Sequence, residues 1–183
     1  MPDVDLDAYM KPRADAATLA ARREALLDQM GWLEDEATAL GPLLGALPPW
    51  AVEQAPLPTD LSVKDTLAAL AILDRDVYAV WFDAAETLAE VPAFAIPSPL
   101  PAPPPTDATL DALLADVATA RRDLRARAAA VTPEAWSRPL TLDGTATDLY
   151  GATLRLVQHD GDRLKEIAYR LHEAVVTMRP PPA

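Results

Sequence analysis

The sequence predicts an all-α protein, and three observations lead to that prediction. Hydrophobic residues make up 50% of the 183-residue chain, and most of them are alanine and leucine, which favour helices. Glycine occurs only 6 times and aromatic residues make up 5% of the chain, which argues against a sheet of many strands. Four long segments carry apolar residues at spacings of three and four, as in helices with one buried face. The length suits a single domain over residues 1–183, with a core from about residue 14 to residue 176.

The first helix is predicted from about Ala14 to Leu44, and Gly41 and Pro42 are expected to kink or end it. Its apolar positions are Leu19, Leu26, Met30, Leu33, Ala37, Leu40 and Leu44. The second helix is predicted to begin at a capping box, in which Ser62 caps the helix and Asp65 reaches back to the Ser62 amide. Its seam contains one acid among apolar residues: Val63, Leu67, Leu70, Asp74, Val77, Trp81, Ala84 and Leu88.

Residues 91–105 contain seven prolines, which exclude a helix and favour polyproline II. Such a segment could be a ligand for a recognition domain, or a stiff crossover that spans the bundle. We favour the crossover, because another predicted helix follows at once and must be positioned.

The third helix is predicted to start near Thr106 or Asp107 and to run to about Ala130. Its apolar positions are Leu110, Leu113, Val117, Ala120, Leu124 and Val131. Residues 132–136 are predicted to form a single capped turn with proline at its first helical position. Asp143 and Gly144 predict a turn.

The fourth helix is predicted to open at Thr145, with Asp148 completing a second capping box. Its seam is Tyr150, Val157, Leu164, Leu171 and Met178, with Thr153, Asp160, Ile167 and Ala174 at the intermediate positions. Residues 179–183 are a proline-rich tail. Four helices with one apolar stripe each predict a four-helix bundle, with the long Pro-rich crossover between helices 2 and 3.

The charge and composition exclude several classes of function. A formal net charge of −12 and a pI of about 4.4 argue against nucleic acid as a partner and against anionic membranes. The chain has no cysteine, so disulfides, thiolate nucleophiles and thiolate metal sites are excluded. The N-terminus lacks the pattern of a signal peptide and no apolar run approaches the length of a membrane span, so we expect a cytoplasmic protein.

Two segments carry motifs of a known kind. Leu61–Leu70 is similar to the pattern W-S-[VI]-x-[DE]-x-[LI]-x-H, with Leu61 at the tryptophan position and Ala69 at the histidine position. Leu156–Ile167 is similar to a last helix with an HxxxH motif, of which His159 stands and the second position holds Arg163. Both patterns resemble the DinB/YfiT-like family, and the resemblance covers roughly residues 14–176. It implies a bundle with a long central crossover.

The resemblance also implies where a metal would bind. In that family three histidines hold a divalent metal, often nickel or zinc, and the corresponding positions here are Ala69, His159 and Arg163. Alanine has no lone pair and a guanidinium is permanently protonated, so the site is degenerate and we expect no cofactor. A substitute nickel or zinc site remains an alternative.

Several charged residues are candidates for the remaining site. Asp74 and Asp160 occupy core positions and each needs a partner, a polar cavity or a role as an acid/base pair. Arg163 is predicted to tie the helices together through Asp160 or an acid of the second helix, or to bind an anionic ligand. The acids of the second helix considered for this role are Asp65 and Asp76. The arginines that could pair with the core acids are Arg22, Arg23, Arg121, Arg122 and Arg163. Trp81 and Tyr150 are further candidates for the cavity wall, as core or lid aromatics, and His172 is expected to be solvated.

Three functions stay open at this point. The first is a metal-independent protein that binds a small molecule in the cavity between the helices. The second is a metal-dependent enzyme that acts on a thiol conjugate or a reactive electrophile, like the S-transferases and isomerases of the family. The third is a dimeric interaction bundle, because family members often form homodimers through helix faces.

Overall fold

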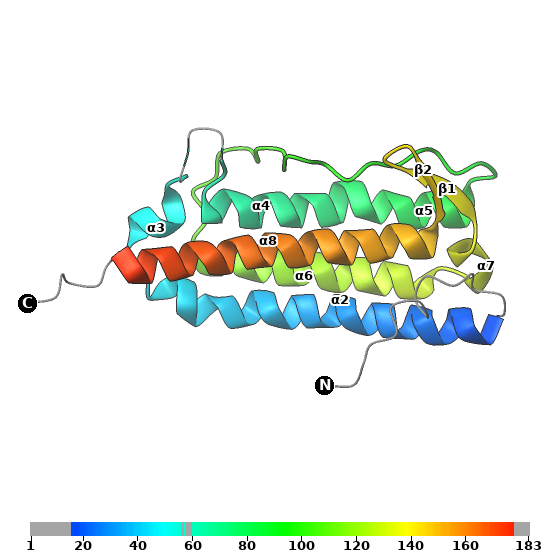
Figure 1. The fold of residues 1–183 in the computed structure, drawn as a ribbon, viewed down its shortest axis with the longest axis horizontal. Coiled ribbons are helices and arrows are strands. Elements are labelled where there is room, and N and C mark those ends of the chain that lie inside the picture. The colour runs from blue at the N-terminus through cyan, green and yellow to red at the C-terminus, as the bar shows by residue number, and fades with distance from the viewer. Residues whose placement is uncertain (1–15, 56, 58–59, 178–183) are drawn as a thin grey trace, which may run out of the picture.

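The structure is a computed structural model that describes residues 16–55, 57 and 60–177. The prediction of a mostly helical protein is confirmed: four long helical segments run side by side along the molecule (Figure 1). They are α2 (Ala16–Gly45); the continuous run of α4 (Val63–Ile72), η1 (Leu73–Tyr78) and α5 (Ala79–Thr87); α6 (Leu110–Ala130); and α8 (Leu149–Thr177). The short helices α3 (Pro49–Glu53) and α7 (Pro133–Trp136) lie in the connections. The predicted start at Ala14, the side chains of Leu33, Leu171 and Ala174, Met178 and the 179–183 tail lie outside what the structure describes.

Helix α2 continues through Gly41 and Pro42 to Gly45, one residue past the predicted Leu44, so these two residues do not end it. A proline removes a single backbone donor, and here it falls close to the end of the helix. The last turn is also fixed in the core, because Leu44 is 1% exposed.

Helix α6 begins at Leu110 and not at Thr106 or Asp107. Thr109 is the N-cap, and its hydroxyl accepts a hydrogen bond from the Ala112 amide at 3.2 Å. The hydroxyl of Thr106 instead accepts a hydrogen bond from the Ala108 amide at 3.1 Å, which forms a local turn before the helix.

The segment before α8 is a β-hairpin, which the sequence analysis missed. Strands β1 (Pro139–Leu142) and β2 (Thr145–Asp148) are antiparallel, and Leu142 pairs with Thr145 across a two-residue turn. Both turn residues have positive φ, 51° at Asp143 and 76° at Gly144, as a type I′ turn requires. Thr145 therefore belongs to a strand and does not open the helix. Asp148, predicted to lie inside the first turn and reach back to Thr145, instead caps the helix itself: its Oδ1 accepts a hydrogen bond from the Gly151 amide at 2.8 Å.

The Pro-rich crossover between α5 and α6 runs along the second helical segment as irregular chain (Figure 1). Phe94 fixes its first part: the Phe94 amide donates to the Thr141 carbonyl at 2.8 Å, and the Asp143 amide donates to the Phe94 carbonyl at 3.0 Å. The Phe94 ring is buried and stacks on Trp81 with centroids 5.3 Å apart. The hairpin and the crossover thus hold each other against the core.

The apolar core consists of two clusters along the helices. One lies toward α5, α7 and the hairpin and includes Leu73, Leu124 and Leu156. The other lies toward α3 and the start of α4 and includes Ala71, Val117 and Ile167. Of the helices formed by the described residues, none has the length and hydropathy of a membrane span.

Candidate functional site

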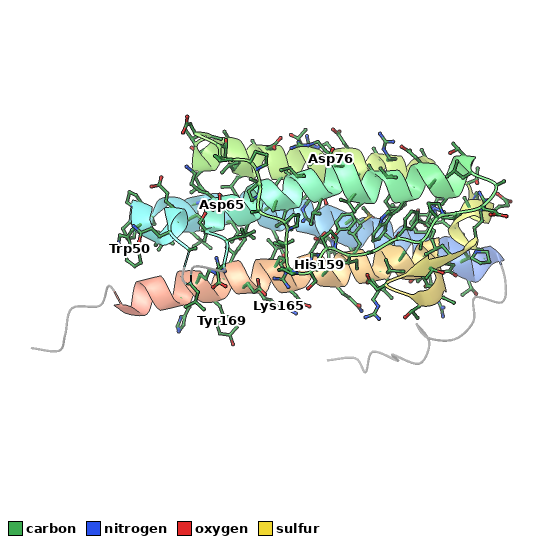
Figure 2. All side chains as sticks on the ribbon, turned by 90° about the horizontal axis from the view of Figure 1, so that it is seen from above. Trp50, Asp65, Asp76, His159, Lys165 and Tyr169 are labelled. Atoms are coloured by element: carbon green, nitrogen blue, oxygen red, sulfur yellow. The ribbon has the colours of Figure 1, made fainter. Side chains whose placement is uncertain are left out.

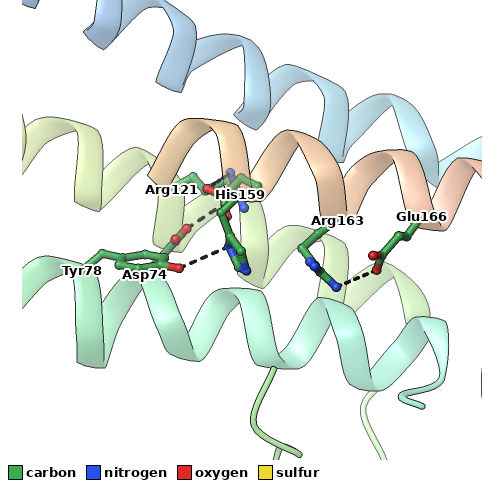
Figure 3. A network of polar contacts seen from close by, with 7 residues as sticks. Asp74, Tyr78, Arg121, His159, Arg163 and Glu166 are labelled. Atoms are coloured by element: carbon green, nitrogen blue, oxygen red, sulfur yellow. Dashed lines mark hydrogen bonds and ion pairs between the residues drawn. The ribbon is translucent and has the colours of Figure 1, made fainter. Parts of the chain in front are cut away.

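Three charged side chains lie at the centre of the molecule, between the two apolar clusters. Asp74 comes from η1, Arg121 from α6 and Asp160 from α8, and they are 1%, 4% and 1% exposed (Figure 3). Arg121 Nη1 donates to Asp160 Oδ2 at 3.0 Å. Arg121 Nε lies 3.7 Å from Asp74 Oδ2, which is an ion pair without a hydrogen bond. We call Asp74, Arg121 and Asp160 the buried triad.

A local change in helix geometry begins beside Asp74. Residues Leu73–Tyr78 form a π-helix, which ends with a hydrogen bond from the Ala79 amide to the Asp74 carbonyl. The π segment adds a residue to the turn between α4 and α5. The predicted seam residues Trp81 and Ala84, which follow it, are still buried, whereas Leu88 lies just after the end of α5 and is 46% exposed. Tyr78, which the sequence analysis overlooked, is fully buried.

The electrostatics of the buried triad are set by two acids that share one guanidinium. Burial raises the pKa of Asp74 to about 7; Arg121 opposes this rise and the charge of Asp160 adds to it. Burial acts to lower the pKa of Arg121, but the two carboxylates outweigh it and raise that pKa above its ordinary value. The triad is therefore electrically neutral when Asp74 holds a proton and Asp160 pairs with Arg121.

The space inside the buried triad is too small for a ligand. Asp74, Arg121 and Asp160, together with Met30, Leu124 and Leu156, line a cavity of about 10 Å³. A cavity of this size holds about one water molecule. Asp74 Oδ1, Asp160 Oδ1 and Arg121 Nη2 are buried without a hydrogen-bond partner among the described residues, so such a water would have polar groups to bind. Asp74 and Asp160 therefore line a cavity with room for a water molecule and not for a larger ligand.

Tyr78 and His159 form a second polar contact beside the triad. The Tyr78 hydroxyl lies 3.3 Å from His159 Nδ1, which is also 3.7 Å from Asp160 Oδ1 (Figure 3). Burial, with Asp160 and then Asp74 adding to it, raises the pKa of Tyr78 above its ordinary value, so the phenol stays protonated. The phenol keeps its proton and its oxygen lies within hydrogen-bond distance of Nδ1, so one ring nitrogen of His159 is engaged inside the core.

Arg163 does not form the tie that the sequence suggested. Its Nη1 donates to Glu166 Oε2 at 2.8 Å, one turn along α8, and Figure 3 shows it directed away from the buried triad. Arg121 makes the contact with Asp160 instead. The reason is geometric: Arg121 approaches Asp160 from a facing helix inside the core, whereas the Arg163 side chain is 26% exposed and pairs locally.

The other candidate residues lie apart from the triad. Ser62 caps α4, because its Oγ accepts a hydrogen bond from the Asp65 amide at 3.0 Å. The Asp65 carboxylate accepts from the Ser62 hydroxyl at 2.6 Å and not from the predicted Ser62 amide. Asp76 is exposed, and Figure 2 shows Asp65 and Asp76 apart from His159. Trp81 and Tyr150 are core aromatics: Trp81 packs edge-on against Tyr78, with centroids 4.9 Å apart, and Tyr150 lies against Trp136.

The donor set at the expected metal positions does not suit a divalent cation. Ala69 is buried and offers no donor, His159 Nδ1 faces the Tyr78 phenol, and Arg163 is a cation. Within residues 16–55, 57 and 60–177, no cluster of three His, Asp or Glu side chains is arranged to bind a metal. His172 is exposed.

A larger polar pocket lies next to Arg163. It has a volume of about 320 Å³ and is bordered by the residues that lead into α4, by the crossover and by α8. Its charged residues are Asp60, Arg163, Glu166 and Arg170. This pocket, and not the buried triad, has the size of a small-ligand site.

Comparison of the chain with known protein families, with curated proteins and with solved structures gave no match.

Proposed function

We propose that this chain is a metal-independent, DinB-like four-helix bundle that binds a small molecule. The resemblance of residues 61–70 and 156–167 to that family supports the bundle assignment, together with the four long helical segments and the crossover in the middle. A cytoplasmic location and a homodimer through helix faces remain predictions that accompany this assignment.

The observation that carries the proposal is the position of Arg121. Its guanidinium lies at the centre of the helices and contacts acids from two other elements, Asp74 and Asp160. A cation held between helices neutralises buried carboxylates and links the segments, as a metal ion does in a metal-centred bundle. Of the three expected ligand positions only His159 carries an imidazole, and because its Nδ1 faces the Tyr78 hydroxyl, Nε2 is the single ring nitrogen left for a metal, which is too few ligands to hold one.

Thermal melting with nickel or zinc tests the proposal, with protein purified without a histidine tag. The melting temperature of the natural chain should stay constant as either metal is added, because a ligand stabilises only a state that it binds. A saturable stabilisation that disappears in His159→Ala would contradict metal independence.

A double variant supplies the positive control and tests the bundle assignment. In the DinB-like arrangement, Ala69→His with Arg163→His restores three imidazoles together with His159. Nickel at about one hundred times its Kd should then stabilise the double variant by about 2.7 kcal/mol, while leaving the natural chain unchanged. A double variant that folds but does not respond to nickel would show that the three positions do not converge as the resemblance implies.

A further inference from the structure

The polar pocket beside Arg163 contains two arginines that are fixed in position but not saturated. Arg163 Nη1 is bound to Glu166 at 2.8 Å, whereas its Nε is buried and has no hydrogen-bond partner among the described residues. Arg170 Nη1 donates to the Leu61 carbonyl, which anchors this side chain to the chain before α4. Each guanidinium has five N–H groups, so both retain donors after these contacts.

The buried Nε of Arg163 indicates what the pocket lacks. A buried donor without an acceptor costs free energy comparable with a lost hydrogen bond, and the cost is larger for a charged group. A carboxylate matches the Nε and Nη edge of a guanidinium with two parallel hydrogen bonds. An oxyanion bound along the Nε and Nη2 edge of Arg163 would therefore satisfy a group that has no partner among the described residues.

The acids of the pocket restrict the kind of anion. Asp60 and Glu166 line it together with Arg163 and Arg170, so the four formal charges sum to zero. A simple dianion would gain from the arginines and be repelled by the acids. A ligand with a carboxylate and an adjacent ammonium or hydroxyl would satisfy both.

We propose that this pocket binds a small amino acid or hydroxy acid, with the carboxylate on Arg163 and Arg170 and the donor group on Glu166 or Asp60. The volume of about 320 Å³ lies at the lower end of the range for small-molecule sites, which suits a ligand of this size. Leu100 of the crossover contributes to the wall, so the stiff Pro-rich segment has a second role in closing one side of the site. The proposal rests on the small-molecule binding proposed above and specifies its ligand class.

Proton–nitrogen NMR titration tests it, because the Arg163 Nε–H group is itself an observable probe. The probes are L-serine, L-lactate, acetate and inorganic phosphate. Serine and lactate should shift the Arg163 Nε–H resonance and amides of residues 60–66 and 163–170, with Kd on the order of 1 mM. Acetate should bind more weakly and phosphate weakest.

Three variants assign the roles of the charges. Arg163→Gln should weaken serine binding by about tenfold or more, because it removes a charge-assisted hydrogen bond. Arg155→Gln makes the same change on an exposed part of α8 outside this pocket and should leave the affinity unchanged. Glu166→Gln should weaken the binding of serine but strengthen the binding of phosphate, because the negative charge that pairs with the ammonium of serine and repels phosphate is gone.

Four results would overturn the proposal. Two concern the resonances: no chemical shift change with any probe, or changes located in another part of the molecule. The other two concern affinity: tighter binding of phosphate than of serine, or equal losses of serine affinity in Arg163→Gln and Arg155→Gln. The metal test of the proposed function is separate from these results. Nickel stabilisation of the natural chain would refute metal independence without touching the pocket, and probe binding elsewhere would refute this pocket without restoring a metal site.

Discussion

Replacing Arg121 with methionine removes the only cation of the buried triad, so Asp74 and Asp160 both lose their ion pair with the guanidinium and only His159 Nδ1, 3.7 Å from Asp160 Oδ1, stays nearby. Both acids are 1% exposed, so neither can regain water unless the helices separate. Breaking a buried ion pair by deleting one partner costs about 3–5 kcal/mol, mostly as the penalty of the uncompensated charge. A domain is stable by only about 5–15 kcal/mol, so Arg121→Met should remove a large share of the free energy of unfolding.

Urea unfolding at neutral pH, followed by circular dichroism, measures this loss as the product of midpoint and slope. Arg122→Met is the matched control, one residue along the same helix. Arg122 pairs with Glu34 at 2.6 Å, but its side chain is 61% exposed. Arg122→Met should therefore lower the free energy of unfolding by only about 0–1 kcal/mol, as is usual for solvent-exposed ion pairs.

A triple variant keeps the test decisive if Arg121→Met does not fold. Asp74→Asn and Asp160→Asn together with Arg121→Met remove all three charges, so no unpaired ion remains and part of the stability should return. Equal losses in Arg121→Met and Arg122→Met would refute the argument that burial makes the triad costly to break. A triple variant less stable than Arg121→Met would refute the explanation by uncompensated charge.

Two further predictions concern pH and helix capping. The pKa of Asp74 is raised to about 7 in the folded state, whereas the pKa of an unfolded Asp is about 3.9. Between about pH 3.9 and about pH 7 the folded chain therefore holds a proton that the unfolded chain has lost. The stability that Asp74 contributes is complete below about pH 4 and is lost as the pH rises toward about 7. Across this pH range the free energy of unfolding of the natural chain should fall, relative to that of Asp74→Asn, by up to about 1.4 kcal/mol per pH unit. A difference between the two free energies that does not change with pH would contradict this prediction. Ser62→Ala removes the hydroxyl that accepts from the Asp65 amide at 3.0 Å and should cost about 1 kcal/mol in urea unfolding, and a neutral result would show that the cap contributes nothing.

The sequence was sufficient to predict the helical segments, because each has an apolar stripe and a cap or proline at its boundary. It was not sufficient at residues 139–148. The Thr145 and Asp148 spacing matches a capping box, but the Asp143–Gly144 turn permits positive φ at two successive residues and pairs the flanking segments as strands. Local capping patterns therefore misplaced the start of α8 by four residues, since pairing across the turn depends on residues before it.

The candidate site was predicted in part. The seam positions of Asp74 and Asp160 indicated buried acids that need a partner, and Arg121 was one of five arginines considered. Sequence alone could not select it, because the choice depends on which helix faces which. The π segment was also not visible in the periodicity. The signal available for Tyr78 was its place four residues after Asp74, on the same side of the helix.

The position of the buried triad between two apolar clusters explains what it adds to the fold. On α6, Val117 and Ala120 belong to one cluster and Leu124 to the other, with Arg121 between them. Apolar clusters of leucine and alanine tolerate sliding of one helix along another, because many registers bury similar surface. The buried triad does not tolerate such sliding. A shift of α6 by one turn, about 5.4 Å, would take the Arg121 guanidinium away from Asp160 and leave two acids buried without a cation. The buried triad therefore contributes less to the free energy of unfolding than to the preference for the native helix register over shifted registers. This is the same task that a central metal performs when it binds ligands from several helices.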